Sequence, residues 1–338
     1  ISQIENGLID PSLKSLEIIA RRLGAPISYF LESSDAVDPV SVETAVRRTY
    51  ELLAEDLDQA QTVARAALAD AEKLGHPNSL ARAQSGSAWV AYYQGHFSQA
   101  ADLFSLAAES YRKAGNLTQT LRALNAAGSA AHRAGDYEVA ASLYTSALEL
   151  TSSLEEPEVT DHLRVLVNLG LLLTDQGKAA EALDVLDKAL NMSVHHREYY
   201  RHGEVHSALG VNYRRLGQID KAVDHYEEAH GFHLAVHETL HAAHAILNCG
   251  NAYSSRGDYA QAKRFLVRAL ESYEELGETA HAANARAELA ILAWKEHQVE
   301  EADRLSHAAM EHLSDEKERG RMLLLRGRIL ASRQEAAA

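Results

Sequence analysis

Residues 250–269 read GNAYSSRGDYAQAKRFLVRA, and this stretch holds the pattern that recurs along the chain. Ala262 and Ala269 stand seven residues apart with Leu266 between them, and Gly257 comes five residues before the first alanine. Seven residues make about two turns of an α-helix, so both alanines lie on one helix face. A small side chain there lets a neighbouring helix approach closely, and the larger residue between the two alanines fills the space that they leave.

The alanine pair returns at a nearly constant interval. Its seven copies are offset by 40, 40, 42, 40, 40 and 40 residues, at Ala60/Ala67, Ala100/Ala107, Ala140/Ala147, Ala182/Ala189, Ala222/Ala229, Ala262/Ala269 and Ala302/Ala309. A fixed period in this range is typical of a stacked repeat architecture. In five units a glycine precedes the first alanine by five residues, at Gly95, Gly135, Gly177, Gly217 and Gly257. Glycine just after a helix ends it through a left-handed residue. Each unit therefore reads as a first helix, a glycine turn and a second helix.

Composition favours an all-α chain. All five prolines fall outside the helical periodicity, and no alternating run of Val, Ile and Thr is bounded by turns. The net charge of −15 argues against a whole-chain nucleic-acid coat, although one small DNA-binding module is compatible with it. The longest apolar run, around residues 166–173, is too short to span a bilayer. With no signal peptide in this sequence and Cys249 as its single cysteine, we expect a cytoplasmic protein without membrane contact.

The first 35 residues differ from the repeats. They contain SQIENG at residues 2–7 and PSLKSLEIIARRLG at residues 11–24, and both runs closely resemble the second half of a Cro/repressor-type helix-turn-helix domain. The resemblance implies that Gln3 reaches base edges in the major groove and that Asn6 lies where the following turn meets phosphate. The first two helices of such a domain would precede residue 1. We expect residues 1–35 to be the C-terminal half of a DNA-binding domain and residues 36–40 to be a linker.

Residues 41–312 resemble tetratricopeptide repeats. The G-D-Y-x-x-A pattern of that family occurs at Gly135 and again at Gly257, although the period here is 40 residues and the usual one is 34. The resemblance implies a right-handed α-solenoid of about seven helical hairpins, with the first helix of each unit lining a concave wall. Cys249 and the tyrosines that repeat with the unit, Tyr137 among them, are expected in the core.

The last segment, residues 313–338, is predicted to be a C-terminal capping helix and tail. Its apolar residues are Met322, Leu323, Leu325, Ile329 and Leu330. They would cover the final repeat, and the alternative is that they form a dimerisation surface.

Inward positions of the first helices supply the candidate binding residues. An asparagine carboxamide both donates and accepts, so several in register could hold the backbone of an extended peptide, and arginines beside them could take a carboxylate. The alternative is that these are ordinary solvated residues of the groove. The predicted peptide-binding residues are Trp89, Tyr92, Asn125, His132, Arg133, Arg164, Asn168, Arg214, Arg215, His244, Asn248 and Asn251. Glu288 and Trp294 occupy inward positions of the last unit.

Together the two resemblances are similar to the RRNPP group, cytoplasmic receptors of Gram-positive bacteria for short signalling peptides. This resemblance implies a quorum-sensing transcription regulator that forms a homodimer, binds an operator DNA through its head, and changes its DNA binding when a short linear signalling peptide occupies the groove.

Two other readings of function stay open. The repeats could form an adaptor that sequesters a protein partner, such as a phosphorelay response regulator. An enzyme would need a clustered acid/base constellation, and none can be assembled, so we expect neither a catalytic site nor a cofactor. The histidines His202/His206 and His233/His237/His241 have a spacing that can bind metal, but no Cys or carboxylate pattern completes a site, so we expect no metal.

Overall fold

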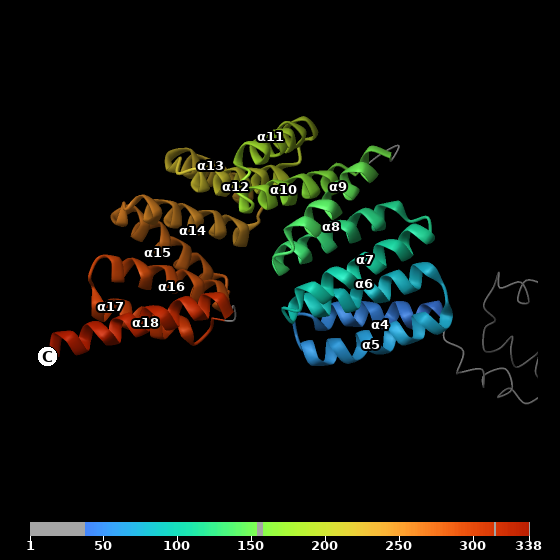
Figure 1. Cartoon of the computed structure of the whole chain (residues 1–338), viewed down its shortest axis with the longest axis horizontal. Coiled ribbons are helices and arrows are strands. Elements are labelled where there is room, and N and C mark those ends of the chain that lie inside the picture. Colours follow the sequence, from blue (N-terminus) through green and yellow to red (C-terminus); the bar gives the residue numbers. More distant parts are fainter. Residues whose placement is uncertain (1–37, 154–157, 314–315, 338) are drawn as a thin grey trace, which may run out of the picture. The chain divides into compact units, whose positions relative to one another are not determined.

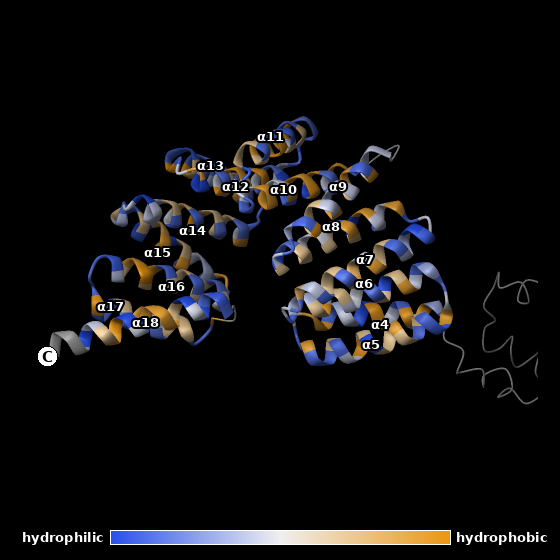
Figure 2. Cartoon of the chain, in the orientation of Figure 1, coloured by the Kyte–Doolittle hydropathy of each residue, from blue (hydrophilic) through white to orange (hydrophobic). Residues whose placement is uncertain are grey.

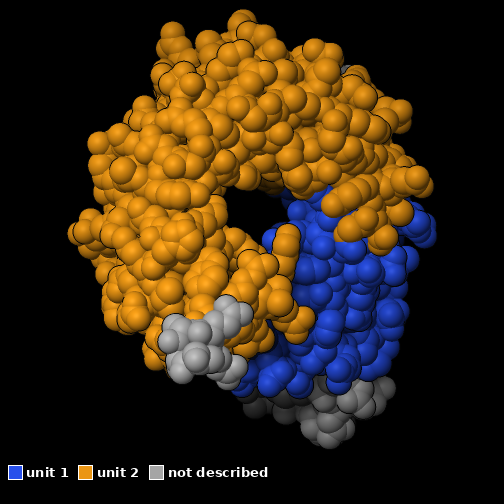
Figure 3. Space-filling view, turned by 60° about the vertical axis from the view of Figure 1, so that its left-hand side comes forward, with its two compact units in different colours: residues 1–134 blue, residues 135–338 orange. Residues whose placement is uncertain are grey.

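The computed structural model describes residues 38–153, 158–313 and 316–337, and every regular element in these ranges is an α-helix. The chain divides into two compact units, residues 1–134 and residues 135–338, which are coloured separately in Figure 3 and are described one at a time below. Gln3 and Asn6, the predicted DNA-binding residues, lie outside the described residues. The prediction of an all-α, tetratricopeptide-like solenoid is confirmed.

Unit 1 contains five described helices (Figure 1). They are α4 (Pro39–Leu52), α5 (Leu57–Leu74), α6 (Pro77–Tyr93), α7 (Phe97–Lys113) and α8 (Leu117–Ala134). Consecutive helices pack against each other, and α4 also contacts α6, so first helices of neighbouring hairpins are adjacent. Helix α4 begins after Asp38, whose Oδ1 accepts hydrogen bonds from the backbone N–H groups of Val40 (2.7 Å) and Ser41 (2.9 Å).

Unit 2 continues the same order through ten described helices. They are α9 (Tyr137–Ser153), α10 (Val159–Asp175), α11 (Ala179–His196), α12 (Tyr199–Arg215), α13 (Ile219–Ala235), α14 (Thr239–Arg256), α15 (Tyr259–Glu275), α16 (Thr279–Lys295), α17 (Val299–Met310) and α18 (Glu316–Ala337). Helix α10 packs against α12, α14 against α16, and α16 against α18. The even-numbered helices of this unit are therefore the first helices of successive hairpins.

The recurring residues do what their spacing predicts. All fourteen alanines of the repeated pair are buried, with no more than 1 % of their surface exposed. The five turn glycines have φ angles between 73° and 87°, the left-handed region that ends a helix without a steric cost to glycine. Figure 2 shows the hydrophobic residues confined to parts of each helix surface, while the turns between helices are mainly hydrophilic.

A second regularity joins each first helix to the second helix of its own hairpin. Gly170 faces Leu186, Gly210 faces Tyr226 and Gly250 faces Leu266, always sixteen residues apart. A Cβ atom at any of these glycines would lie 2.5–2.7 Å from the larger side chain, closer than two carbon atoms can approach. The small residue is required because the large residue between the two alanines occupies its space.

Burial corrects one prediction and divides another. Tyr137 is 39 % exposed, because it stands at the first residue of α9, before the helix enters the packed layer. Cys249 is fully buried, as predicted. On α18, Met322, Leu325 and Ile329 are buried against the last hairpin, whereas Leu323, Leu324 and Leu330 are exposed, so one face of the helix caps the repeat.

None of the helices in the described residues combines the length and the apolar character needed to cross a membrane.

Candidate functional site

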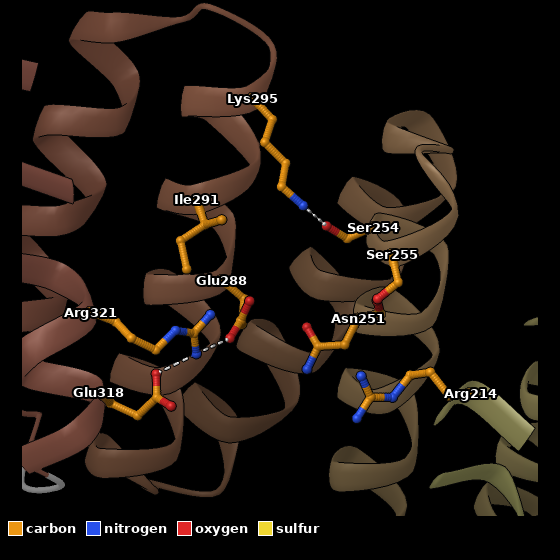
Figure 4. Close-up of a pocket in the computed structure, with 9 residues that line it drawn as sticks. All are labelled: Arg214, Asn251, Ser254, Ser255, Glu288, Ile291, Lys295, Glu318 and Arg321. Carbon is orange, nitrogen blue, oxygen red and sulfur yellow. Dashed lines mark hydrogen bonds and ion pairs between the residues drawn. The ribbon is translucent and has the colours of Figure 1, made fainter. Parts of the chain in front are cut away.

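The candidate site is a polar pocket of about 390 Å³ within unit 2, formed by four even-numbered helices (Figure 4). Its lining residues are Arg214 of α12; Asn251, Ser254 and Ser255 of α14; Glu288, Ile291 and Lys295 of α16; and Glu318 and Arg321 of α18. Because each of these helices is the first of a hairpin or the capping helix, the pocket lies on the side of the unit that the repeat pattern predicts to be the inner wall.

The repeat itself brings these side chains together. Asn251 and Ile291 occupy equivalent positions 40 residues apart, and so do Arg214 and Ser254. Ser255 and Lys295 form a third such pair, which continues backwards through Arg215 to Asp175 of α10. Arg215 and Asp175 form an ion pair between α12 and α10, and Lys295 Nζ donates to Ser254 Oγ at 3.2 Å. Equivalent positions of successive helices therefore make one continuous polar surface.

Arg321 ties the capping helix to the pocket. Its guanidinium donates to Glu288 Oε1 at 2.9 Å and to Glu318 Oε2 at 2.6 Å. Burial alone would lower the pKa of Arg321, but the two carboxylates together raise it above its ordinary value. Counting Arg214, Lys295 and Arg321 against Glu288 and Glu318, three cations less two carboxylates leave the pocket with one net positive charge, in a chain whose net charge is −15.

Asn251 has unused hydrogen-bonding capacity at the centre of this surface. Its Oδ1 atom is buried and accepts no hydrogen bond from any residue that the structure describes. Leaving a buried acceptor unpaired costs about 1–3 kcal/mol, which a ligand N–H group would recover. Arg214 and Lys295 form no ion pair with a carboxylate in the described part of the chain. The pocket thus offers one acceptor for an N–H donor beside two cations for an anion.

The predicted residues of unit 1 lie mostly in a cluster of rings on α6 and α7. The Trp89 ring centroid lies 5.5 Å from that of Tyr92 and 5.1 Å from that of the buried Phe104. Tyr92 packs against Phe97 at 5.3 Å, and the guanidinium of Arg133 from α8 lies 4.8 Å above the Phe97 ring. Phe104 fills the core between Ala100 and Ala107, so Trp89 serves packing as well as any inner surface. Two further predicted residues lie on α8: buried Asn125 and half-buried His132.

The other predicted residues of unit 2 are not gathered in the pocket. Arg164 is paired with the buried carboxylate of Asp161 in its own helix at 3.3 Å. Asn168 of α10 and Asn248 of α14 are half-buried. His244 belongs instead to a set of histidine rings at the other end of α14. Of the twelve predicted residues, Arg214 and Asn251 alone line the described pocket, and the assignment of peptide binding to the twelve stays a prediction.

Sequence reasoning missed six pocket residues and named one. Glu288 was recognised as an inward position, whereas Trp294 packs against the hydrophobic core of the last hairpin. Ser254, Ser255, Ile291 and Lys295 follow Asn251 and Glu288 at helical spacings of three, four or seven, a signal that could have found them. Glu318 and Arg321 come from the capping helix, whose orientation no repeat pattern fixes.

No group of three or more His, Cys, Asp or Glu side chains in the described residues is arranged to hold a metal ion.

Known proteins support the fold. The sequence model of the tetratricopeptide repeat family matches residues 119–194, 161–232 and 201–275, whereas no curated protein matches the chain. Among solved structures, aspartyl phosphate phosphatase F from Bacillus subtilis has a TM-score of 0.61 at 15 % identity, over 88 % of this chain and 78 % of that one. The Rap conjugation gene regulator of plasmid pLS20, in complex with the Phr* peptide, has a TM-score of 0.57 at 12 % identity, over 87 % and 96 %.

A third solved structure, a tetratricopeptide repeat protein from Parabacteroides merdae, has a TM-score of 0.59 at 17 % identity, over 84 % of this chain and 98 % of that one. At such identities these likenesses concern the fold. The chain contains tetratricopeptide repeats, and its fold is similar to that of Rap proteins.

Proposed function

We propose that this chain is a cytoplasmic transcription regulator controlled by a short linear signalling peptide. The peptide binds along the even-numbered helices of unit 2, in the pocket that contains Arg214, Asn251 and Lys295. A helix-turn-helix head, to which Gln3 and Asn6 belong, binds operator DNA as part of a homodimer. Peptide binding changes how tightly the paired heads hold the operator, and by linkage the operator changes peptide affinity by the same factor.

The unpaired Oδ1 of buried Asn251 is the observation that carries this proposal. An extended peptide presents a backbone N–H group about every 3.3 Å along each edge pair of residues, so one can reach a fixed acceptor on a groove wall without any particular side chain. Arg214 and Lys295 stand ready for the C-terminal carboxylate of the peptide or for an acidic side chain. Ile291 supplies an apolar contact between them.

The comparisons support the proposal by analogy of fold. The plasmid pLS20 regulator contains the Phr* peptide, and another structure of the same fold is a Rap protein complexed with Competence and Sporulation Factor. The latter has a TM-score of 0.54 at 15 % identity, over 89 % of this chain and 99 % of that chain. Proteins of this architecture therefore include ones that hold such ligands, which favours the same use of the pocket here.

Substitution of Asn251 tests the assignment. A displayed library of short linear peptides would be selected on the wild-type protein, and the tightest peptide would be labelled for fluorescence anisotropy. We expect Asn251→Ala to weaken its binding about tenfold or more, because the buried N–H group of the peptide loses its acceptor. Asn191→Ala, on the exposed surface of α11, is the matched control and should bind as the wild type does. Equal affinities for both variants would contradict the site.

A protein-binding adaptor is the second candidate function, and the likeness to aspartyl phosphate phosphatase F favours it. Such an adaptor would retain a folded protein partner rather than a peptide, and the head would be secondary. Selection of a random duplex DNA library on the protein, followed by gel-shift assays with and without the selected peptide, separates the two functions. A peptide-dependent shift of a selected duplex supports the regulator, whereas absence of any selected duplex favours the adaptor.

A further inference from the structure

Seven histidines of unit 2 contact one another through helices α12–α16. We call them the histidine array: His202, His206, His225, His233, His241, His244 and His281. They come from three consecutive hairpins, and they lie where the N-terminal halves of α12, α14 and α16 meet the second helices of the hairpins. The candidate pocket uses the other halves of the same three helices, so the array is a separate feature.

The first group of the array holds the α12/α13 hairpin together. Nδ1 of His206 and Nδ1 of His225 are 3.1 Å apart, a hydrogen bond that requires one protonated and one bare nitrogen. The ring of His206 also contacts that of His202 at 4.7 Å, and the Phe232 ring packs on His202 at 4.3 Å. Nδ1 of His202 is 2.8 Å from Ser193 Oγ of α11. This packing accommodates neutral imidazoles, because a second proton on the His206–His225 pair would break the bond that joins them.

The second group joins α13 to α14 and α16. His233 is 2 % exposed and lies between the rings of Tyr200 (5.8 Å) and His241 (5.3 Å). Gly203 of α12 makes room for it, since a Cβ there would lie 2.8 Å from the imidazole. The other six units carry a larger residue at the position of Gly203 wherever that position falls in a described helix, with Ala243 and Ala283 as its nearest equivalents.

His244 extends the second group across the next hairpin. Its ring lies 4.8 Å from that of His281 on α16 and 5.5 Å from that of the buried Tyr273 on α15. The His241 ring follows at 6.0 Å. Three helices are therefore joined here through rings that lie within about one ring diameter of each other.

Acidic groups surround the array at its edges rather than at its buried members. His241 Nδ1 lies 3.4 Å from Glu238, and His281 Nδ1 lies 3.1 Å from Glu278. The remaining charged neighbours are Glu228 beside His202 and His225, Asp187, Asp224 and Lys221 beside His225, and His230 beside His233. His206 is faced by His202 and His225. Burial first, and then these neighbouring histidines, lower the pKa of His206, His233 and His244 to about 4.

We propose that the histidine array is an acid-sensitive seam, which holds hairpins α12/α13 and α14/α15 and helix α16 together when its rings are neutral and releases them when acid charges it. Imidazolium rings at these separations repel each other in a poorly hydrated interior and can regain water only if the helices part. In the unfolded chain a histidine titrates near its ordinary pKa of 6.5, above the folded value. Stability is therefore fully present above pH 6.5 and is lost as the pH falls from there towards 4.

Thermal unfolding at two pH values tests the seam. Melting of the full chain would be followed by circular dichroism at pH 7 and pH 5 for the wild type, for His233→Phe/His244→Phe and for His195→Gln/His196→Gln. We expect the wild-type Tm to fall by roughly 5 °C or more at pH 5. The phenylalanine variant, whose rings cannot be charged, should lose less than half as much. The exposed pair His195 and His196 is the matched control, and its variant should behave as the wild type does.

A second measurement needs no substitution in the core. Histidine labelled with ¹³C at Cε1 in the wild type gives one titration curve per ring by NMR. Array resonances that stay neutral until the tertiary structure is lost, below about pH 5, support the proposal. The proposal is overturned if the array titrates near pH 6.5 in a chain that stays folded, or if the phenylalanine variant is as acid-sensitive as the wild type. Should that variant fail to fold at pH 7, the NMR titration decides alone.

Discussion

Each repeat depends on a small residue that accepts a large neighbour. Gly210 on α12 lies against the ring of Tyr226, which is fully buried between Ala222 and Ala229. The sequence pattern predicts that the residue between the alanines fills space, and the structure shows which backbone that space belongs to. The pairing could not be read from the period alone, because it links two helices of one hairpin whose rotation about their axes is set by packing.

Substitution of Gly210 by alanine measures this complementarity. The new methyl group would lie 2.5 Å from Cε1 of Tyr226 and force the ring or the helix to move. Overpacking of this kind costs about 1–3 kcal/mol, which outweighs the gain of roughly 0.5–1 kcal/mol from replacing glycine within a helix. We expect Gly210→Ala to lower the free energy of unfolding by about 1–2 kcal/mol in urea denaturation.

Gly231→Ala is the control for that measurement. Gly231 also lies inside a helix, α13, but it is exposed and a Cβ there would meet nothing within 4 Å. Its substitution should stabilise the chain by up to about 1 kcal/mol, since only the helix propensity changes. If both variants shifted stability in the same direction, the proposed complementarity between Gly210 and Tyr226 would be wrong.

At the scale of elements, the helices followed from the sequence more closely than the site did. Alanine and glycine positions predicted the hairpins, because burial of small residues and left-handed turns are local requirements. The pocket depends on which face of each helix a neighbour covers. Arg214 and Asn251 could be chosen by counting along a repeat, but Arg321 enters through α18, which has no counterpart in the repeat.

The histidine array shows the same limit from another side. Its members stand at several different positions of the repeat, so no period connects them, and the sequence suggested only isolated pairs with metal-binding spacing. The one available signal was Gly203, a glycine inside a predicted helix where other units carry larger residues. Ring contacts between hairpins become visible only when the helices are packed.

The attachment of α18 to the pocket makes a prediction about that element. Arg321 joins α18 to Glu288 of α16, and the guanidinium is partly exposed, so solvent screens the pair. We expect Arg321→Ala to reduce the protection of α18 amides from hydrogen exchange about fivefold, equivalent to roughly 1 kcal/mol, and less at high salt.

Arg328→Ala provides the comparison for α18, because Arg328 lies on the exposed side of the same helix. It should leave the protection of α18 unchanged, and exchange in α10 and α12 should stay unchanged in both variants. Equal loss of protection in the two variants would mean that helix propensity, rather than the Arg321–Glu288 pair, holds α18 in place.

For the whole molecule, the account separates what the fold provides from what the function adds. Tetratricopeptide-like repeats give a series of equivalent helix faces, and similar folds include structures with a bound peptide and an aspartyl phosphate phosphatase. The particular chemistry of this chain lies in the polar wall of unit 2, with its unpaired acceptor and its surplus cation. The head at residues 1–35 and its contact with DNA rest on the sequence resemblance.

The central claim is that a short peptide occupies this wall, and a crystal structure of the chain with the peptide selected on it tests that claim most directly. The account predicts an extended peptide across α12, α14 and α16, with one backbone N–H group donating to Asn251 Oδ1 and a carboxylate near Arg214 or Lys295. A peptide bound to another surface, with Asn251 still unpaired, would contradict it.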